Sequence, residues 1–256
     1  MSEAIFSTDT GGGGDAVLLV HAIGCDHRMW DALEADLAKS FRVMRMDVRG
    51  HGKSAVTPRP YSLGALADDA AAVLDQRGVR KAHWVGLSMG GMIGQAFALG
   101  HPQRLGRLVL ANTTSSYGPE GPKMWEARAK AVADGGMAAI TELAMTRYFS
   151  DEFRANHADI VDRVRRRFLE TPAQGYIACC DAIRDLDLTA DLARVHARTL
   201  VIAGDKDAGT PVAMSETIAT RIPGAKLAVI AGAAHLSAVE SPAQFNPLVR
   251  RFLEAP

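Results

Sequence analysis

A serine between two glycines is the first feature of this chain that could do chemistry. The stretch Gly86-Leu87-Ser88-Met89-Gly90 follows an apolar run, residues 82–85, and opens a Gly- and Ala-rich helical pattern, residues 89–99. A serine at such a strand–turn–helix junction is held in a strained conformation with its hydroxyl exposed. The two glycines avoid the Cβ clashes of so tight a turn. We therefore predict that Ser88 is a nucleophile, in preference to a plain Gly-rich helix start.

A serine hydroxyl is a weak nucleophile and needs a base that accepts its proton. Of the eight histidines, those beyond the serine and its helix are His157, His196 and His235. His157 lies in a charged helical pattern typical of a solvated face. His196 precedes a strand, which is the wrong end of a parallel sheet for a site. His235 follows the last predicted strand, so we predict that it is the base rather than a structural loop histidine.

The acid that orients the base should come from a loop at the same edge of the sheet. Two aspartates, Asp205 and Asp207, follow the apolar strand at residues 199–203. We predict that Asp207 fixes the imidazole tautomer, and that Asp205 hydrogen-bonds within its own turn. The corresponding position after the strand at residues 107–111 is Asn112, which cannot supply a carboxylate.

Backbone amides should stabilise the oxyanion that forms on the attacked carbonyl. We predict the N–H of Met89, at the start of a helix, and the N–H of Ile23, in the loop His21-Ala22-Ile23-Gly24. His21 is a candidate for substrate contact or for holding this loop. Cys25 is a rival nucleophile, but no base adjoins it, and free cysteine is usually a small buried apolar residue. No His/Cys/Asp cluster has metal-ligand spacing, so neither a metal nor another cofactor is predicted.

Short apolar strands alternate with helical patterns along most of the chain. The predicted strands are residues 16–21, 41–46, 82–85, 107–111, 199–203 and 226–230, and the clearest helices are 63–76, 89–99 and 246–253. This alternation predicts an α/β fold with a mostly parallel sheet covered by helices on both faces. The four glycines at residues 11–14 precede a strand instead of joining a strand to a helix. We therefore predict a flexible hairpin loop there and not a phosphate cradle.

The alternation stops between residues 117 and 192, where the composition is helical and no strand is convincing. We predict that residues 117–192 form a helical cap over the strand ends, inserted into a core made of residues 1–116 and 193–256. The cap contains Trp125, a candidate for lining the pocket or for packing the cap onto the core.

Composition excludes several classes of function. The 256 residues include 29 Lys+Arg and 29 Asp+Glu, so the net charge is zero and nucleic-acid binding is not expected. The N-terminus lacks the pattern of a signal peptide, and no apolar run is long enough for a membrane span. The three cysteines, Cys25, Cys179 and Cys180, form a poor disulfide framework. Reduced thiols fit a cytoplasmic protein better.

The predicted triad of Ser88, Asp207 and His235 makes the chain resemble the α/β-hydrolases over nearly its full length. Within them it resembles the 3-oxoadipate enol-lactonases of bacterial aromatic degradation. The stretches that carry this resemblance are residues 86–94, Arg147-Tyr148-Phe149, Cys179-Cys180 with Ala182-Ile183 and Asp187-Leu188, and Ala233-Ala234-His235-Leu236-Ser237 before Glu240-Ser241-Pro242.

The resemblance implies a small-molecule substrate, an enol-lactone that bears a carboxylate and is opened through an acyl-enzyme. Arg147 is then a candidate for binding that carboxylate, with a cap salt bridge as the alternative. The loop that begins at His21 differs from the Asn-Ser-Leu-Gly usual in those lactonases and matches general esterases. A small-acyl carboxylesterase is therefore the nearest alternative, followed by a C–C bond hydrolase and a non-catalytic small-molecule receptor.

Overall fold

A seven-stranded sheet runs through residues 5–255, the part of the chain that this computed structural model describes. Its strand order is β1-β3-β2-β4-β5-β6-β7, and every neighbouring pair is parallel except β1 with β3. The strands are β1 (Ser7–Asp9), β2 (Ala16–Val20), β3 (Arg42–Met46), β4 (Ala82–Leu87), β5 (Leu105–Ala111), β6 (Thr199–Gly204) and β7 (Lys226–Ile230). All residues of β2 and β6 are buried, as expected for parallel strands covered on both faces.

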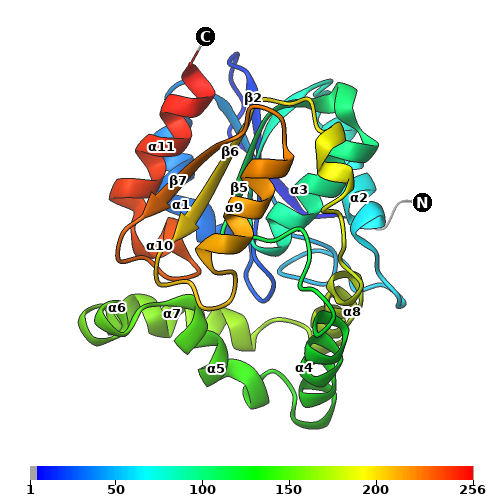
Figure 1. Cartoon of the computed structure of the whole chain (residues 1–256), viewed down its shortest axis with the longest axis vertical. Helices are drawn as coiled ribbons and strands as arrows, with labels where there is room; N and C mark the ends of the chain where they lie inside the picture. The colour runs from blue at the N-terminus through cyan, green and yellow to red at the C-terminus, as the bar shows by residue number, and fades with distance from the viewer. Residues whose placement is uncertain (1–4, 256) are drawn as a thin grey trace.

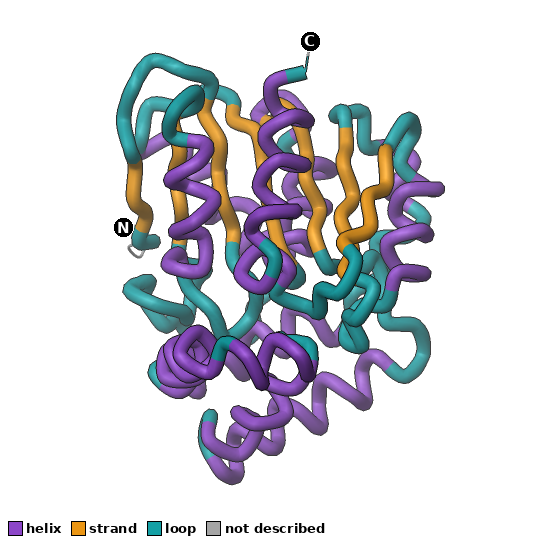
Figure 2. Tube along the Cα trace, turned by 90° about the vertical axis from the view of Figure 1, so that its left-hand side faces the viewer, coloured by secondary structure: helices purple, strands orange, loops and turns teal. Residues whose placement is uncertain are grey.

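Helices cover both faces of the sheet, which confirms the predicted fold class (Figures 1 and 2). One face carries α1 (Asp31–Leu37) and α11 (Pro242–Glu254), which pack against each other. The other carries α2 (Leu63–Gln76), α3 (Met89–Gly100) and α9 (Val212–Arg221). Shorter elements are η1 (His27–Trp30), η2 (Pro102–Arg104), η3 (Asp191–Arg194) and α10 (Ser237–Glu240). None of the helices described between residues 5 and 255 is long and apolar enough to cross a bilayer.

Further helices lie beyond the carboxyl ends of the strands, at the bottom of Figure 1. They are α4 (Gly121–Gly135), α5 (Ala138–Tyr148), α6 (Asp151–Asn156), α7 (Ala158–Leu169) and α8 (Ala173–Arg184), here called the cap helices. Helix α4 packs along α8, and α5 packs against α7. Helix α8 meets the core backbone to backbone, because a Cβ added at Gly175 would lie 2.0 Å from the carbonyl oxygen of Gly50.

Three of the differences between the predicted elements and the structure have a clear cause in the sequence. β1 was not predicted, because three polar or small residues at an antiparallel sheet edge carry no apolar signal. Residues 11–14 join β1 to β2, but β3 lies between those strands, so the predicted hairpin is wrong. Helix α11 begins at Pro242 and not at Asn246, because Pro247 lies inside the helix and not at its start.

Candidate active site

Ser88 lies between the end of β4 and the start of α3 in a strained backbone conformation, with φ 56° and ψ −116°. Such a conformation costs about 1–3 kcal/mol and persists only where the surroundings enforce it. A Cβ added at Gly86 would lie 2.1 Å from the carbonyl oxygen of Gly90, and one at Gly90 would lie 2.0 Å from that of Val20. The tight elbow predicted from the sequence is therefore present, and only glycine fits on either side of it.

Asp207 and His235 come together at the carboxyl ends of β6 and β7. His235 Nδ1 lies 2.8 Å from Asp207 Oδ2, and both side chains are buried. A carboxylate at this distance accepts a hydrogen bond from Nδ1–H, so the neutral ring keeps its lone pair on Nε2. Neither Nε2 of His235 nor Oγ of Ser88 is hydrogen-bonded to any residue between 5 and 255. The geometry thus provides an oriented imidazole with a free basic nitrogen.

The Asp207 carboxylate is held by several donors besides the histidine. Oδ1 accepts from the amides of Gly209 (2.8 Å) and Thr210 (2.9 Å), and Oδ2 accepts from the Thr210 hydroxyl (2.7 Å). Burial alone would raise the pKa of Asp207, but the charge and hydrogen bond of His235 and the bonds from Thr210 outweigh it and lower the pKa. Asp207 therefore stays ionised, as an acceptor for the imidazole must.

Asn112 supplies a link that the sequence did not reveal. It follows β5, which lies between β4 and β6, and it has a positive φ of 44°. Its Nδ2 donates to Asp207 Oδ2 (3.0 Å) and to the carbonyl oxygen of Ala234 (3.2 Å), while its Oδ1 accepts from the Ser237 hydroxyl. Asn112 cannot supply a carboxylate, but its hydrogen bonds connect the loop that carries Asp207 to the loop that carries His235.

The peptide group between Ile23 and Gly24 is held at both ends. The Tyr148 hydroxyl, from α5, donates to the carbonyl oxygen of Ile23, and the Gly24 amide donates to His51 Nε2 at 3.0 Å. Burial lowers the pKa of His51 to about 3, so the ring stays neutral and can accept this bond. The Tyr148 ring also stacks on His235, with ring centroids 5.9 Å apart. The cap helices therefore help to position both the Ile23 loop and the His235 ring.

His21 stabilises the same loop from the core side. Its Nε2 accepts from the Val48 amide, and its Nδ1 lies 2.8 Å from the Ala22 carbonyl oxygen, to which it donates. Both ring nitrogens are thus used within the protein, and we propose no substrate contact for His21. The amides of Ile23 and Met89, predicted to bind the oxyanion, form no hydrogen bond to the residues that the structure describes. Both amides are therefore free to bind an oxyanion.

The remaining candidates of the sequence analysis lie away from this site or are inert. His157 and His196 are exposed. Burial raises the pKa of the Cys25 thiol, which disfavours the reactive thiolate. Asp205 accepts from the Gly232 amide (2.7 Å) on the neighbouring loop, so the predicted bond within its own turn is wrong. Loops after adjacent parallel strands lie side by side, which brings this distant partner within reach.

A cluster of polar donors in the cap helices has no acceptor among residues 5–255. Trp125 Nε1, Arg128 Nε and Tyr176 Oη are shielded from solvent and lack hydrogen-bond partners. The Arg128 guanidinium lies 5.3 Å from the Trp125 ring centroid and 5.9 Å from that of Tyr176. Buried donors without acceptors are costly, so these groups suit a ligand that brings oxygen acceptors.

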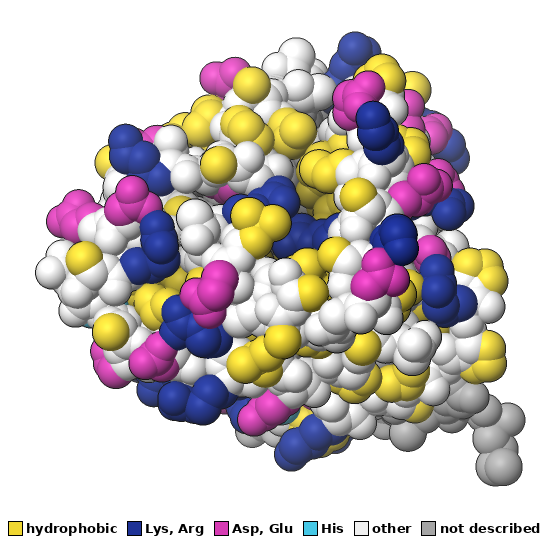
Figure 3. All heavy atoms as spheres, turned by 90° about the horizontal axis from the view of Figure 1, so that it is seen from below, with side chains coloured by type: hydrophobic (Ala, Val, Ile, Leu, Met, Phe, Trp, Pro, Cys, Tyr) yellow, Lys and Arg dark blue, Asp and Glu magenta, His cyan; other side chains and the backbone are white. Residues whose placement is uncertain are grey.

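Arg147 adds a second cation near the same place. A Cβ added at Gly209, in the loop that carries Asp207, would lie 3.1 Å from Arg147 Nη2. Neither Arg147 nor Arg128 forms an ion pair with an acid of the described chain. Burial raises the pKa of Tyr117, Tyr148 and Tyr176, and the charges of both arginines oppose each rise. Figure 3 shows that the face on the cap side is hollowed, with Lys or Arg side chains inside the hollow.

Arg128 could not be predicted as a site residue, because little in the local sequence distinguishes it from the other arginines of the cap helices. Arg165, for example, forms ion pairs with Glu142 and Asp162. The distinction between the two arginines depends on which acids lie near them in space. The one available signal was the spacing of Trp125 and Arg128, which places both side chains on the same face of a helix.

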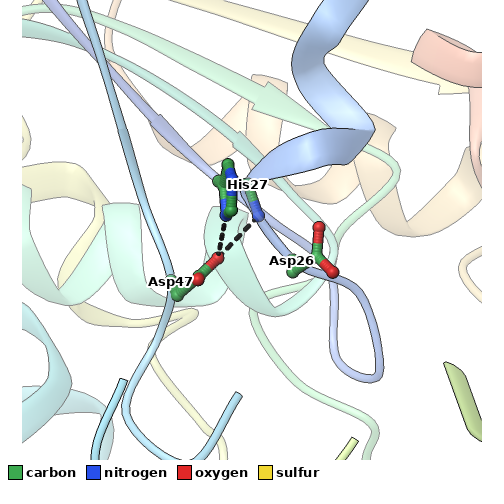
Figure 4. A group of neighbouring side chains, drawn as sticks. All are labelled: Asp26, His27 and Asp47. Atoms are coloured by element: carbon green, nitrogen blue, oxygen red, sulfur yellow. Dashed lines mark hydrogen bonds and ion pairs between the residues drawn. The ribbon is translucent and has the colours of Figure 1, made fainter. Parts of the chain in front are cut away.

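Asp26, His27 and Asp47 form a second polar cluster, which their sequence spacing did not predict (Figure 4). Asp47 Oδ1 accepts from the amide and Nδ1 of His27, and Oδ2 accepts from the Lys53 amide. Asp26 is occupied by Arg28. Burial would raise the pKa of Asp47, but the His27 bonds and other nearby groups lower it to about 2. These hydrogen bonds connect two loops of the core, and this connection explains why the cluster is present.

Comparison with known proteins places the geometry in context. A family model described as the alpha/beta hydrolase fold matches residues 15–242. The chain is 33% identical over 239 residues to 3-oxoadipate enol-lactonase 2 of Acinetobacter baylyi, covering 93% of this chain and 88% of that protein.

Solved structures agree with this match. A hydrolase from Pseudomonas aeruginosa superposes with a TM-score of 0.94 at 38% identity, covering 99% of both chains. An enol-lactonase from Burkholderia xenovorans superposes with a TM-score of 0.94 at 31% identity, covering 97% of this chain and 96% of the other. The chain therefore belongs to the alpha/beta hydrolase family.

Proposed function

We propose that this protein hydrolyses an ester or lactone that carries a carboxylate, with an enol-lactone as its preferred substrate. The observation that carries the proposal is the Arg128 guanidinium, which lies over the rings of Trp125 and Tyr176 with a shielded donor and no acid partner in the described chain. A carboxylate is the ligand that best satisfies a guanidinium, because it accepts two parallel hydrogen bonds. Trp125 Nε1 lies in the same cluster as a further donor, and Arg147 adds a second positive charge.

In the proposed reaction, Ser88 Oγ attacks the carbonyl carbon while its proton passes to His235 Nε2. The oxyanion accepts hydrogen bonds from the amides of Ile23 and Met89. When the tetrahedral intermediate collapses, the ring C–O bond breaks and the leaving enol oxygen takes the proton from His235. A water molecule then attacks the acyl carbon while His235 Nε2 takes one of its protons. The bond from that carbon to Ser88 Oγ breaks, and the proton passes from His235 to Oγ. Asp207 stabilises the imidazolium at each stage.

The substrate class is tested by comparing two esters that differ in one charge. The 4-nitrophenyl monoester of succinic acid carries a free carboxylate, and 4-nitrophenyl butyrate is its neutral counterpart. Replacing Arg128 by Met keeps the apolar stem and removes the charge. We expect kcat/KM for the charged ester to fall about 10²-fold, within the range for losing one partner of a buried charge pair. The rate on the neutral ester should stay within about threefold, a change of less than 1 kcal/mol.

Arg165→Met serves as the matched control, because Arg165 is a cap arginine already paired with acids. Equal losses on both esters in Arg128→Met would contradict the assignment of the carboxylate site. A fluorophosphonate probe that labels the wild type but not Ser88→Ala tests the nucleophile separately. The same assays on 3-oxoadipate enol-lactone compare a cyclic with a linear substrate.

A small-acyl carboxylesterase is the second candidate function. The observation that favours it is His21 at the start of the Ile23 loop, where both its nitrogens hold the backbone. That candidate predicts a higher kcat/KM on 4-nitrophenyl acetate than on either carboxylate-bearing substrate.

A further inference from the structure

A cavity of about 270 Å³ lies between the cap helices and the core, and the catalytic residues do not line it. One wall is made by Ile160 and Val164 of α7. The other is made by Met29 of η1, Val239 of α10 and Leu236, which directly precedes α10. Cavities for drug-sized ligands have volumes of about 300–1,000 Å³. This one is slightly smaller and mostly apolar in its walls, so it suits a small ligand with an apolar body.

The charges that line this cavity are unbalanced. Arg28 is neutralised by Asp26, with Nη2 2.5 Å from Oδ2, and lies 3.4 Å from Glu170. The other acid of the lining, Asp31, is paired with Arg45. Arg163 and Arg167 of α7 also line the cavity, and neither guanidinium group has an ion pair or hydrogen bond with residues 5–255.

Arg167 is the more deeply placed of the two. Burial lowers the pKa of Arg167, and the positive charge of Arg28 lowers it further, while the negative charges of Asp26 and Asp31 partly oppose this shift. An arginine stays charged in spite of such shifts. The cavity therefore combines apolar walls with two guanidinium groups that have no acid of their own.

We propose that this cavity binds the carboxylate of a medium-chain fatty acid, with the carboxylate at Arg163 and Arg167 and the alkyl chain between α7 and α10. A planar carboxylate matches the guanidinium fork, and an alkyl chain gains by leaving water for the apolar walls. The proposal does not depend on the reaction proposed above, because none of its residues belongs to the triad or to the Arg128 cluster.

A ligand in this cavity would lie beside the residues that adjoin Ile23 and His235. Gly24, which lines the cavity, follows Ile23, and Leu236 follows His235. A Cβ added at Gly24 would lie 2.4 Å from the Phe168 ring of α7, so cap and core already touch at this point. A bound chain would extend this contact and hold α7 on the core.

The test is calorimetric titration of octanoate into four proteins: the wild type, the double variant Arg163→Ala/Arg167→Ala, Arg166→Ala and Arg128→Met. Arg166 is an exposed arginine of the same helix that does not line the cavity. We expect saturable binding that is about tenfold weaker in the double variant, the low end for charge-assisted hydrogen bonds that are partly exposed. Arg166→Ala and Arg128→Met should bind octanoate like the wild type, and octyltrimethylammonium should not bind.

Two outcomes would overturn the proposal. Binding that is lost in Arg128→Met but kept in the double variant would place octanoate at the catalytic site. Binding that does not saturate below about 10 mM, weaker than a millimolar site, would show no built site. Val164→Trp, which fills the cavity and keeps both arginines, should also abolish binding while circular dichroism shows an intact fold.

Discussion

Replacing Tyr148 by Phe removes a single oxygen atom that joins a cap helix to the proposed oxyanion loop. The Tyr148 hydroxyl donates to the carbonyl oxygen of Ile23, and both groups are buried. Burial raises the pKa of this phenol well above its ordinary value, so it remains a donor at any assay pH. The substitution leaves the ring that stacks on His235.

The expected cost follows from the unsatisfied carbonyl group. Leaving a buried acceptor without a donor costs about 1–3 kcal/mol of stability. The Ile23 amide belongs to the same tight loop, so part of that free energy should appear as poorer oxyanion stabilisation. We expect kcat to fall about tenfold, equivalent to about 1.4 kcal/mol. This is less than the roughly 10²–10³-fold loss caused by removing an oxyanion donor, and KM should change little.

The assay measures kcat and KM on a neutral 4-nitrophenyl ester, together with urea unfolding. Tyr176→Phe is the matched control, because the Tyr176 hydroxyl is buried but has no hydrogen-bond partner in the described chain. Its removal should leave both kcat and stability unchanged or slightly improved. If Tyr148→Phe loses stability but keeps its full kcat, the hydroxyl has only a structural role and the reasoning about the loop is refuted.

Three other substitutions test the site and its supports. Asp207→Asn should lower kcat about 10⁴-fold, as the same change does in another serine hydrolase, because an amide favours the wrong imidazole tautomer; a normal rate on 4-nitrophenyl butyrate would contradict the triad. Asn112→Ala should lower kcat about tenfold, because it removes a hydrogen bond to the charged Asp207, and such a bond contributes about 1.5–3 kcal/mol. The pH–rate profile should also change; an unchanged profile with normal kcat would argue against a positioning role for Asn112. Asp47→Asn should lose about 2 kcal/mol of stability at pH 7, because its pKa falls from 3.8 to about 2 on folding. That contribution is present above pH 4 and is lost as the pH falls toward 2, so urea unfolding should show the gap to wild type closing in this window; a gap that does not change with pH would refute it.

The sequence predicted the residues of the site that follow apolar strands. Ser88 directly follows β4, Asp207 and His235 lie in the loops after β6 and β7, and parallel strands bring their carboxyl ends to one edge. Their order along the chain also matches the motif context of the elbow. The hydrogen bond between Asp207 and His235 agrees with that prediction, while the catalytic roles stay a prediction that the substitutions above test.

The supporting residues could not be predicted in the same way. The sequence excludes Asn112 as the acid, and nothing local shows that its amide reaches two other loops. Tyr148 lies 125 positions from Ile23 along the chain, so their contact exists only after the cap helices have docked. Arg128 is set apart by the absence of a neighbouring acid, and that property belongs to the tertiary structure.

The contact between Gly50 and Gly175 has a consequence for recombining this protein with its relatives. A side chain at either position would meet the backbone of the other, at 2.0 Å for Gly175 and 2.6 Å for Gly50. A chimera joined anywhere between these residues takes one glycine from each parent, and it folds with the cap in place only if both parents have glycine there. The pair therefore sets which cap segments can be exchanged, and donor sequences can be screened for it before any are built.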